Sequence, residues 1–413
     1  MEKEIELRRG EGILLRSPLR FEVLSGEVES WGVTIDETSV DLEGVELLIV
    51  SRSDVSKLKV DGSFGRISNP IPEWWLNLPE KIVGKKVMLI GRVDSGKSST
   101  MLYFINKIVS IGTNVGIVDS DIGQSDLGPP GVISSKTIEE PILHTKILKP
   151  DFMYFIGDKT PNGHFLPMIK GSIEALKAVR SSTVLINTTG FVDGGAARAL
   201  KRFKAEFLEP DIVIAIERKE GALDHIARSL PKDIKVYKVK SPVGKSAKER
   251  SYRIAVRRSL LRKFLEGSKT LELDLSSLEL RNTYLFTGES KPDYIPFLET
   301  VLGTKILWLE ESPDMLIVLT EGLPDRRKIA NIADLLHKEV KVGTVQHYNG
   351  LYVGLLGKGR CLGIGILESI DLNKKSVRIT TPVHERNIEG LAFGYIRFNA
   401  NGEEIGTRGM NIP

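Results

Sequence analysis

The fold is decided by the stretch Val87-Met-Leu-Ile-Gly91-Arg-Val-Asp-Ser-Gly96-Lys97-Ser98-Ser-Thr100. Its first four residues are apolar and predict a buried strand, and the apolar spacing over residues 99–110 predicts a helix. Between them, Gly91 to Ser98 matches G-x-x-x-x-G-K-[ST] in the strand–loop–helix context that a phosphate-binding loop requires. The stretch therefore predicts a nucleoside-triphosphate site in an α/β domain.

Each position of this loop has a physical reason. Gly91 and Gly96 let the backbone approach phosphate oxygens, and the loop N–H groups with the helix N-terminus favour an anion. Lys97 supplies a positive charge for the β- and γ-phosphates, and the Ser98 hydroxyl completes the shell of a Mg²⁺ ion. We expect ATP to be bound by Gly91, Arg92, Val93, Asp94, Ser95, Gly96, Lys97, Ser98 and Ser99.

The composition is that of an ordinary globular protein with several domains. The chain has 413 residues, too many for one hydrophobic core, with 41% hydrophobic and 27% charged residues. Its single cysteine excludes a disulfide framework and a cysteine zinc site. The net charge of +4 permits nucleic-acid binding without arguing for it.

The location of the protein is also predicted from composition. The N-terminus lacks an apolar targeting segment and no apolar run has spanning length, so we expect an intracellular, cytoplasmic protein without a membrane partner. Glutamine occurs only at Gln124 and Gln346, whereas Lys, Glu, Ile and Val are abundant. This composition indicates a heat-adapted source.

Three domains are predicted. Residues 1–78 show short alternating segments between Gly, Ser and Asp turns, which indicate a β-domain, and Trp74 and Trp75 should pack its Pro-rich linker against the next domain. Residues 79–267 alternate strands and helices, which predicts a phosphate-loop domain with a parallel sheet. Residues 268–413 return to mainly β character, with one amphipathic helix at 325–337.

Two acids, Asp119 and Asp121, follow the second predicted strand of the central domain. Acids at the carboxyl end of a central strand lie where such sheets place their chemistry, and in extended geometry these two share one side of the chain. One can hold Mg²⁺ or its water, and the other can accept a proton from an attacking hydroxyl. The alternative is that both cap the strand end in solvent.

Two further segments are candidates for ligand contact. The strand at 183–186 leads into Asn187-Thr-Thr-Gly-Phe191, whose small residues can approach a ligand and whose Phe191 is either a base-stacking ring or a core residue. Residues 245–263 carry eight cations and one acid, and helical spacing places Arg250, Arg253 and Arg257 on one face, continued by Leu260 and Phe264. This helix is either a solvated face or a lid whose arginines stabilise a transferring phosphoryl group.

Motifs that are missing narrow the class of enzyme. A GTPase would carry Asn-Lys-x-Asp, and both Asn-Lys pairs of the sequence fail at the last position. The signature of ABC-type ATPases is missing after the phosphate loop. What remains is phosphoryl transfer to a hydroxyl group by a kinase with a lid.

Four segments in this order carry a resemblance: the phosphate-binding loop, residues 119–124, residues 188–191 and the Arg-rich helix. They resemble the polynucleotide 5′-hydroxyl kinases, which include the RNA kinase of the pre-mRNA cleavage factor and the kinases of ribosomal-RNA processing. The resemblance covers most of the chain, is specific mainly over residues 84–265, and suggests an archaeal-type member. It implies that Asp121 orients or deprotonates the 5′-hydroxyl and that Gln124 contacts the terminal nucleotide. It also implies that a clasp on the nucleic acid is formed by Thr188, Thr189, Gly190 and Phe191. The clasp usually ends in Trp, so Phe191 should stack more weakly.

The expected protein is thus an ATP- and Mg²⁺-dependent kinase for the 5′-hydroxyl end of RNA, with DNA as an open second acceptor. Its expected catalytic residues are Lys97, Asp121, Arg253 and Arg257, and its expected metal ligands are Ser98 and Asp119. One alternative is an inactive ATP-binding scaffold that meets protein partners in an RNA-processing complex. Another is a kinase for a small nucleoside-like molecule, which would have no need of the flanking β-domains.

Overall fold

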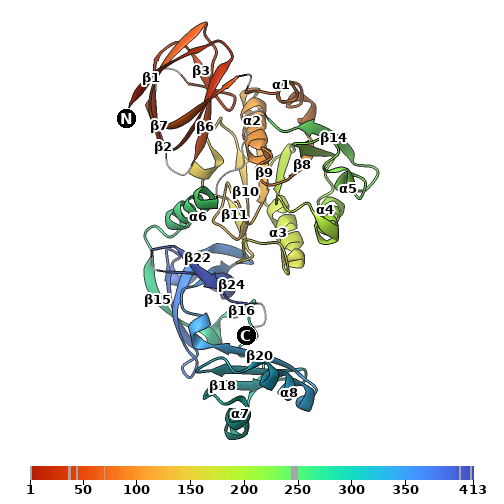
Figure 1. Cartoon of the computed structure of the whole chain (residues 1–413), viewed down its shortest axis with the longest axis vertical. Helices are drawn as coiled ribbons and strands as arrows, with labels where there is room; N and C mark the ends of the chain where they lie inside the picture. The colour runs from red at the N-terminus through yellow and green to blue at the C-terminus, as the bar shows by residue number, and fades with distance from the viewer. Residues whose placement is uncertain are drawn as a thin grey trace. The chain divides into compact units, whose positions relative to one another are not determined.

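The computed structural model describes residues 2–35, 39–42, 45–68, 70–242, 250–399, 401–409 and 412–413. The chain forms two compact units, Met1–Leu261 and Arg262–Pro413 (Figure 1). Lys245 and Lys248, part of the basic segment singled out in the sequence, lie outside the described residues. In the part of the chain that is described, no helix is both long and apolar enough to cross a membrane.

The first unit opens with an antiparallel sheet of short and long strands. Within the described residues its order is β1-β7-β2-β6-β3-β4, with β5 paired to β2. Register shifts in the pairing of β2 with β7 mark bulges, which bend a long strand pair. The strands are β1 (Lys3–Arg8), β2 (Glu11–Ser25), β3 (Val28–Ser30), β4 (Val33–Ile35), β5 (Ser39–Leu42), β6 (Glu46–Ser51) and β7 (Val55–Ser68).

The second sheet of this unit carries the phosphate-binding loop. Its order is β11-β10-β9-β12-β8-β13-β14 among the described residues. Only β10 runs against its two neighbours, because the loop at 121–131 returns the chain directly and not through a crossover helix. The strands are β8 (Lys86–Gly91), β9 (Val115–Ser120), β10 (Val132–Ile138), β11 (Phe152–Phe155), β12 (Val184–Thr188), β13 (Ile212–Glu217) and β14 (Lys235–Lys240). The parallel sheet expected from the sequence is thus present, with one antiparallel strand inside it.

Helices cover both faces of this sheet. On one face the apolar side chains of β8, β9 and β12 pack against α3 and α4. On the other face they pack against α2, in a core that also includes the N-terminal sheet. The helices of the unit are α1 (Glu73–Asn77), α2 (Lys97–Ser110), α3 (Phe165–Lys177), α4 (Gly194–Leu208), α5 (Asp224–Ala227) and α6 (Arg250–Phe264), the last of which continues past the end of the unit at Leu261.

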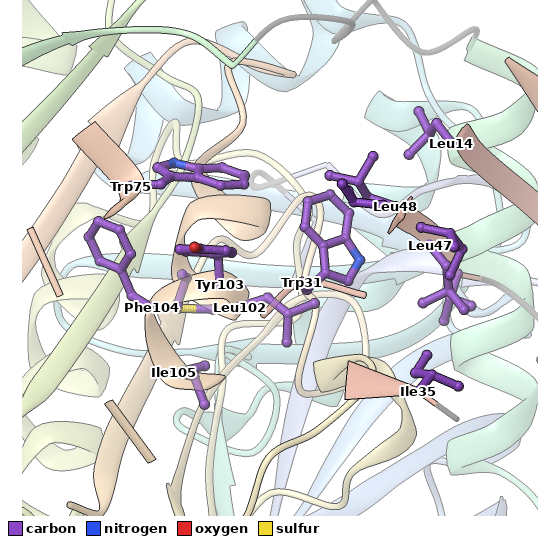
Figure 2. Close-up of a cluster of buried hydrophobic side chains, with 14 of the residues drawn as sticks. Leu14, Trp31, Ile35, Leu47, Leu48, Trp75, Leu102, Tyr103, Phe104 and Ile105 are labelled. Atoms are coloured by element: carbon purple, nitrogen blue, oxygen red, sulfur yellow. The ribbon is translucent and has the colours of Figure 1, made fainter. Parts of the chain in front are cut away.

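The N-terminal sheet and the phosphate-loop sheet share this core through aromatic side chains. Figure 2 shows Trp31 between the rings of Trp75 and Tyr103 and the leucines of β6. The Trp75 ring stacks on Tyr103 with centroids 4.9 Å apart, and its Nε1 donates to Thr100 Oγ1 at 3.1 Å. Trp74 packs edge-on against Phe104 of α2. The expected packing of the linker by Trp74 and Trp75 is therefore confirmed, and the boundary expected at residue 78 falls inside one compact unit.

The second unit is mainly β, as expected. Its larger sheet has the order β15-β23-β22-β21-β24-β16 with β25 paired to β24, and its smaller sheet has the order β17-β18-β19-β20. Helix α8 lies where the amphipathic pattern predicted it, and α7 was not predicted. The elements are β15 (Lys269–Asp274), β16 (Glu279–Arg281), β17 (Glu289–Ser290), α7 (Ile295–Leu302), β18 (Ile306–Glu311), β19 (Met315–Thr320), α8 (Arg326–Leu336), β20 (Glu339–Thr344), β21 (Leu351–Gly357), β22 (Arg360–Asp371), β23 (Ser376–Thr381), β24 (Gly390–Phe398) and β25 (Glu404–Thr407).

Candidate nucleotide and acceptor site

The phosphate-binding loop joins β8 to α2 with the geometry that its glycines allow. Gly96 has φ 96°, and a Cβ there would lie 2.8 Å from Pro242 Cδ, so no other residue fits without a shift. The Lys97 side chain is 5% exposed, and its Nζ donates to the backbone oxygens of Gly91 at 2.9 Å and Arg92 at 3.0 Å. Burial lowers the pKa of Lys97, and nearby acidic side chains oppose that shift. The ammonium is thus held within the loop itself.

The loop is braced from neighbouring strand ends. The Arg92 guanidinium donates to both carboxylate oxygens of Asp193, at 2.5 and 2.6 Å, so the loop is tied to the start of α4. Arg218, which follows β13, donates to the backbone oxygen of Asp94 at 2.6 Å. A bidentate pair fixes orientation as well as distance. Arg92 therefore serves as a brace in this structure.

A cavity with an empty volume of about 1140 Å³, counting the part open to solvent, lies over the loop. Its wall comes from the phosphate-binding loop, the loop after β9, residues 144–146, α6 and the N-terminal sheet. The predicted site residues that line it are Val93, Asp94, Ser95, Gly96, Lys97, Ser98, Ser99, Asp121, Gln124, Arg253 and Arg257. The predicted residues placed elsewhere are Gly91, Arg92, Asp119, Thr188, Thr189, Gly190 and Phe191.

Asp119 is fully buried and organises the loop that follows β9. Oδ1 accepts from Asn187 Nδ2 at 3.1 Å and from Asp121 N at 3.2 Å, and Oδ2 accepts from Ser125 Oγ at 3.2 Å, Asp126 N at 2.7 Å and Leu127 N at 3.2 Å. Burial, with the like charges of Asp126 and Asp121, raises the pKa of Asp119 to about 7. Its hydrogen bonds connect β9, β12 and the loop.

Asp121 differs from Asp119 although only one residue separates them. It is 9% exposed and lies at the cavity wall, where its Oδ1 accepts the backbone N–H groups of Gly123 and Gln124, each at 3.1 Å. Strand β9 ends at Ser120, so the alternation that would place both acids on one side stops between them. Asp119 is therefore buried in the fold, and Asp121 lines the cavity.

The predicted clasp follows β12, next to the phosphate-binding loop. Thr188 is fully buried, and its hydroxyl donates to the backbone oxygen of Leu89 at 2.7 Å. Gly190 lies against the loop so closely that a Cβ would be 2.6 Å from Val93 N. Phe191 is half-buried, with its ring 6.2 Å from that of Phe165. The clasp thus touches the nucleotide loop through Gly190, and Phe191 packs on the core.

Helix α6 presents one face to the cavity. Arg253, Arg257 and Leu260 line the wall at helical spacing, and Leu260 and Leu261 are buried. Arg250, expected on the same face, is exposed and contributes nothing to the wall. The helix is thus anchored near its C-terminal end and carries two arginines over the phosphate-binding loop.

Sequence reasoning missed the contribution of the N-terminal sheet to this cavity. Leu14, Arg16, Trp31 and Glu46 all line it, and the Arg16 and Glu46 side chains form an ion pair at 3.3 Å. Leu14 and Arg16 belong to β2, Glu46 begins β6, and Trp31 lies in the turn between β3 and β4. Only the shared core brings them to the nucleotide loop.

The comparisons with known proteins agree with this geometry. Residues 91–267 match the family model for the mRNA cleavage and polyadenylation factor CLP1 P-loop. The polyribonucleotide 5′-hydroxyl-kinase of Pyrococcus furiosus is 33% identical over 327 residues, which are 78% of this chain and 90% of that relative. The chain belongs to the family of polyribonucleotide 5′-hydroxyl-kinases.

A second archaeal relative and a solved structure also match over most of the chain. The polyribonucleotide 5′-hydroxyl-kinase of Methanocaldococcus jannaschii is 30% identical over 78% of this chain and 89% of its own. A solved chain of Clp1p, in complex with Pcf11p, has a TM-score of 0.70 over 96% of this chain and 98% of its own, at 13% identity, and shares the fold. The resemblance read from the sequence is confirmed, and its archaeal, heat-adapted character agrees with these relatives.

Proposed function

We propose that this protein transfers the γ-phosphate of ATP to the 5′-hydroxyl end of RNA. The observation that carries the proposal is one cavity that gathers the loop lysine Lys97, the carboxylate of Asp121 and the two arginines of α6. The archaeal relatives at 30–33% identity are named polyribonucleotide 5′-hydroxyl-kinases, which supports RNA as the acceptor.

Binding of ATP follows from the phosphate-binding loop. Its N–H groups and Lys97 would hold the β- and γ-phosphates, with the lysine leaving its present acceptors in the loop. Trp31 and Leu14 from the N-terminal sheet would offer apolar surface to the rest of the nucleotide. The two sheets of the first unit would therefore both contact ATP.

The donor set at the loop fits a Mg²⁺ ion, which favours oxygen ligands and is usually held by one or two protein groups together with substrate phosphates. The Ser98 hydroxyl is the ligand we propose, because Ser98 lines the same cavity as Asp121. A bound ion would neutralise charge on the β- and γ-phosphates. The expectation that Asp119 joins Ser98 as a metal ligand stays a prediction. Both carboxylate oxygens of Asp119 already accept hydrogen bonds, which argues against it.

The transfer step is assigned to Asp121. The 5′-oxygen forms a bond to the γ-phosphorus, the bond from that phosphorus to the β,γ-bridging oxygen breaks, and ADP leaves. The hydroxyl proton passes to the Asp121 carboxylate, which the N–H groups of Gly123 and Gln124 hold at the wall. Arg253 and Arg257 would stabilise charge on the transferring group.

The acceptor would enter on the side of β12. Gln124 lines the cavity beside Asp121 and is the residue we propose for the terminal nucleotide. The segment Thr188–Phe191 would hold the next part of the strand, with the backbone at Gly190 close to the nucleotide loop. Protein partners are a further proposal, supported by the solved Clp1p chain in complex with Pcf11p.

The test is incubation of the pure protein with γ-labelled ATP and matched RNA and DNA oligonucleotides that carry a 5′-hydroxyl. The expected result is label on the RNA in the presence of Mg²⁺ and none when EDTA is added. The same oligonucleotides with a 5′-phosphate are the control and should stay unlabelled. Label on a free nucleoside alone would favour the small-molecule kinase, and ATP binding without any transfer would favour the scaffold.

A further inference from the structure

Two lysines of α4 are buried beneath the site, in a place where lysine is costly. Lys201 and Lys204 are both 0% exposed. Taking an amino group out of water costs several kcal/mol on the order-of-magnitude scale unless hydrogen bonds replace the lost solvent. The partners of these two groups therefore indicate what they do.

Lys201 is bonded to the predicted clasp. Its Nζ donates to Thr188 Oγ1 at 2.8 Å, to the backbone oxygen of Thr189 at 2.6 Å and to Thr189 Oγ1 at 3.2 Å. Thr188 Oγ1 in turn donates to the backbone oxygen of Leu89, on the strand that enters the phosphate-binding loop. One amino group thus ties α4 to the ends of both β12 and β8.

Lys204, one turn further along α4, makes a parallel connection. Its Nζ donates to Ser120 Oγ at 2.7 Å, and Ser120 Oγ donates to the backbone oxygen of Asn187 at 2.7 Å. Ser120 is the last residue of β9 and directly precedes Asp121. Helix α4 therefore joins three strands, β8, β9 and β12. These strands lead into the phosphate-binding loop, Asp121 and the clasp.

Neither lysine can meet a substrate, because neither lines the cavity. A methionine has nearly the same length and would fill the same space without the cost of desolvation, so packing alone does not account for an amino group at position 201. Its contacts end on the two threonines that precede Gly190, where an added Cβ would lie only 2.6 Å from Val93 N. A small shift of this segment would move the clasp relative to the nucleotide loop.

We propose that Lys201 is a positioning residue, which holds the segment Thr188–Gly190 at a fixed place beside the phosphate-binding loop so that the RNA end meets ATP in line. The expected loss of transfer to RNA rests on the proposed function. The expected loosening of Thr188–Gly190 rests on the geometry alone. Misplacement of reacting groups by about 1 Å costs roughly 10²-fold in rate, so a loosened clasp should reduce transfer.

The kinetic test is Lys201→Met, assayed with 5′-hydroxyl RNA. We expect kcat/KM for RNA to fall by about tenfold or more, with the Kd of a fluorescent ATP analogue within about twofold of wild type and the Tm not lowered. The control is Arg198→Met, on the exposed side of the same helix, which should leave all three quantities unchanged. Unchanged RNA kinetics in folded Lys201→Met would overturn the proposal.

A second variant decides the matter if Lys201→Met fails to fold. Thr188→Val removes the hydroxyl that Lys201 contacts while keeping the shape of a fully buried side chain. We expect the same direction of change in kcat/KM for RNA, and partial recovery with Thr188→Ser. Where both single variants fold, the double variant should lose no more than Lys201→Met alone, because both act through one contact. Wild-type kinetics of Thr188→Val would contradict the proposal.

Hydrogen exchange separates this inference from the proposed function. Amides of residues 189–191 should exchange faster in Lys201→Met than in wild type or Arg198→Met, and this readout requires no turnover. If the wild-type protein transfers phosphate to no RNA or DNA end, the proposed function fails, and the exchange result alone judges Lys201. Unchanged exchange at these amides would then refute its positioning role.

Discussion

At the scale of single residues, two aspartates of one loop are placed in very different surroundings. Asp119 accepts hydrogen bonds from a loop, a neighbouring strand and a serine, and is closed off from the cavity. Asp121 lines the cavity and retains part of its surface. A carboxylate that takes a proton from a substrate needs to reach it, so we propose Asp121 as the base and Asp119 as a structural support of its loop.

The corresponding prediction concerns Asp121→Asn. Loss of a general base lowers kcat by about 10²- to 10⁴-fold, and ATP affinity should change much less because the amide keeps an oxygen for the Gly123 and Gln124 N–H groups. Steady-state kinetics with RNA and nucleotide-binding titrations would measure both quantities. Asp119→Asn is the companion variant and should mainly lower Tm. A large loss of kcat in Asp119→Asn with a small one in Asp121→Asn would reverse the two roles.

Single residues also show which parts of the site could be predicted from the sequence. Lys97 and Ser98 were predicted because a short contiguous motif dictates both their chemistry and their backbone. The separation of Asp119 from Asp121 was not predictable, since it depends on where β9 ends, and strand ends are set by tertiary hydrogen bonds such as that from Asn187. Lys201 and Lys204 escaped notice because a lysine on a helix is ordinarily exposed, and only the sheet above α4 buries them.

Buried Lys204 should also affect how stability depends on pH. Burial lowers its pKa from 10.5 to about 7, so between these values the unfolded chain binds a proton that the folded chain lacks. Stability then rises with pH across this window, and the cost of the buried charge is fully present below pH 7. Lys204→Met removes that cost. We expect its free energy of unfolding, relative to wild type, to be most favourable below pH 7 and to decline by a few kcal/mol at most toward pH 10.5.

Urea denaturation of wild type and Lys204→Met across this pH range would test that difference. Arg198→Met serves as control, because its head group is exposed and its difference from wild type should be flat. A difference between Lys204→Met and wild type that does not vary with pH would mean that the buried amino group keeps its proton through the window.

At the scale of elements, α6 joins a buried end to a charged face. Leu260 and Leu261 fix its C-terminal half, and Arg253 and Arg257 project into the cavity one turn apart. The sequence predicted this helix and its two arginines because a 3.6-residue period is a local property. It could not predict that Arg250 would lie off the wall, since that depends on the angle at which α6 crosses the cavity.

The prediction for α6 distinguishes a lid from a solvated basic face. Catalytic arginines in phosphoryl transfer are worth about 10³- to 10⁵-fold, so Arg253→Ala and Arg257→Ala should each lower kcat by about tenfold or more. Arg262→Ala and Lys263→Ala are matched controls from the same helix, outside the cavity wall, and should matter far less. Kinetics of the four variants at two salt concentrations would give the answer. Equal, salt-sensitive effects on the KM for RNA, with kcat unchanged, would show a solvated face instead.

At the scale of the molecule, the first unit is two sheets with one core. Strand patterns identified the sheets at 1–78 and 79–267 because alternation is visible in the sequence, but whether two sheets merge is decided by a few large side chains. Here Trp31 of the N-terminal sheet, Trp75 of the linker and Tyr103 of α2 pack together, and Trp31 also lines the cavity (Figure 2). The division into three domains stays a prediction. Because the first two predicted domains share one core, we expect them to unfold together.

Trp75→Ala should therefore destabilise both sheets at once. Truncating a fully buried tryptophan costs about 3–5 kcal/mol, and here it also removes the hydrogen bond to Thr100. If the two sheets form one cooperative unit, hydrogen exchange in β6 and in β9 should accelerate together and by similar factors. Leu76→Ala, at an exposed position of the same short helix, is the control and should leave both unchanged. Faster exchange in β6 with β9 unaffected would show that the N-terminal sheet opens independently, and in that case its contribution to the cavity would be lost without unfolding of the phosphate-binding loop.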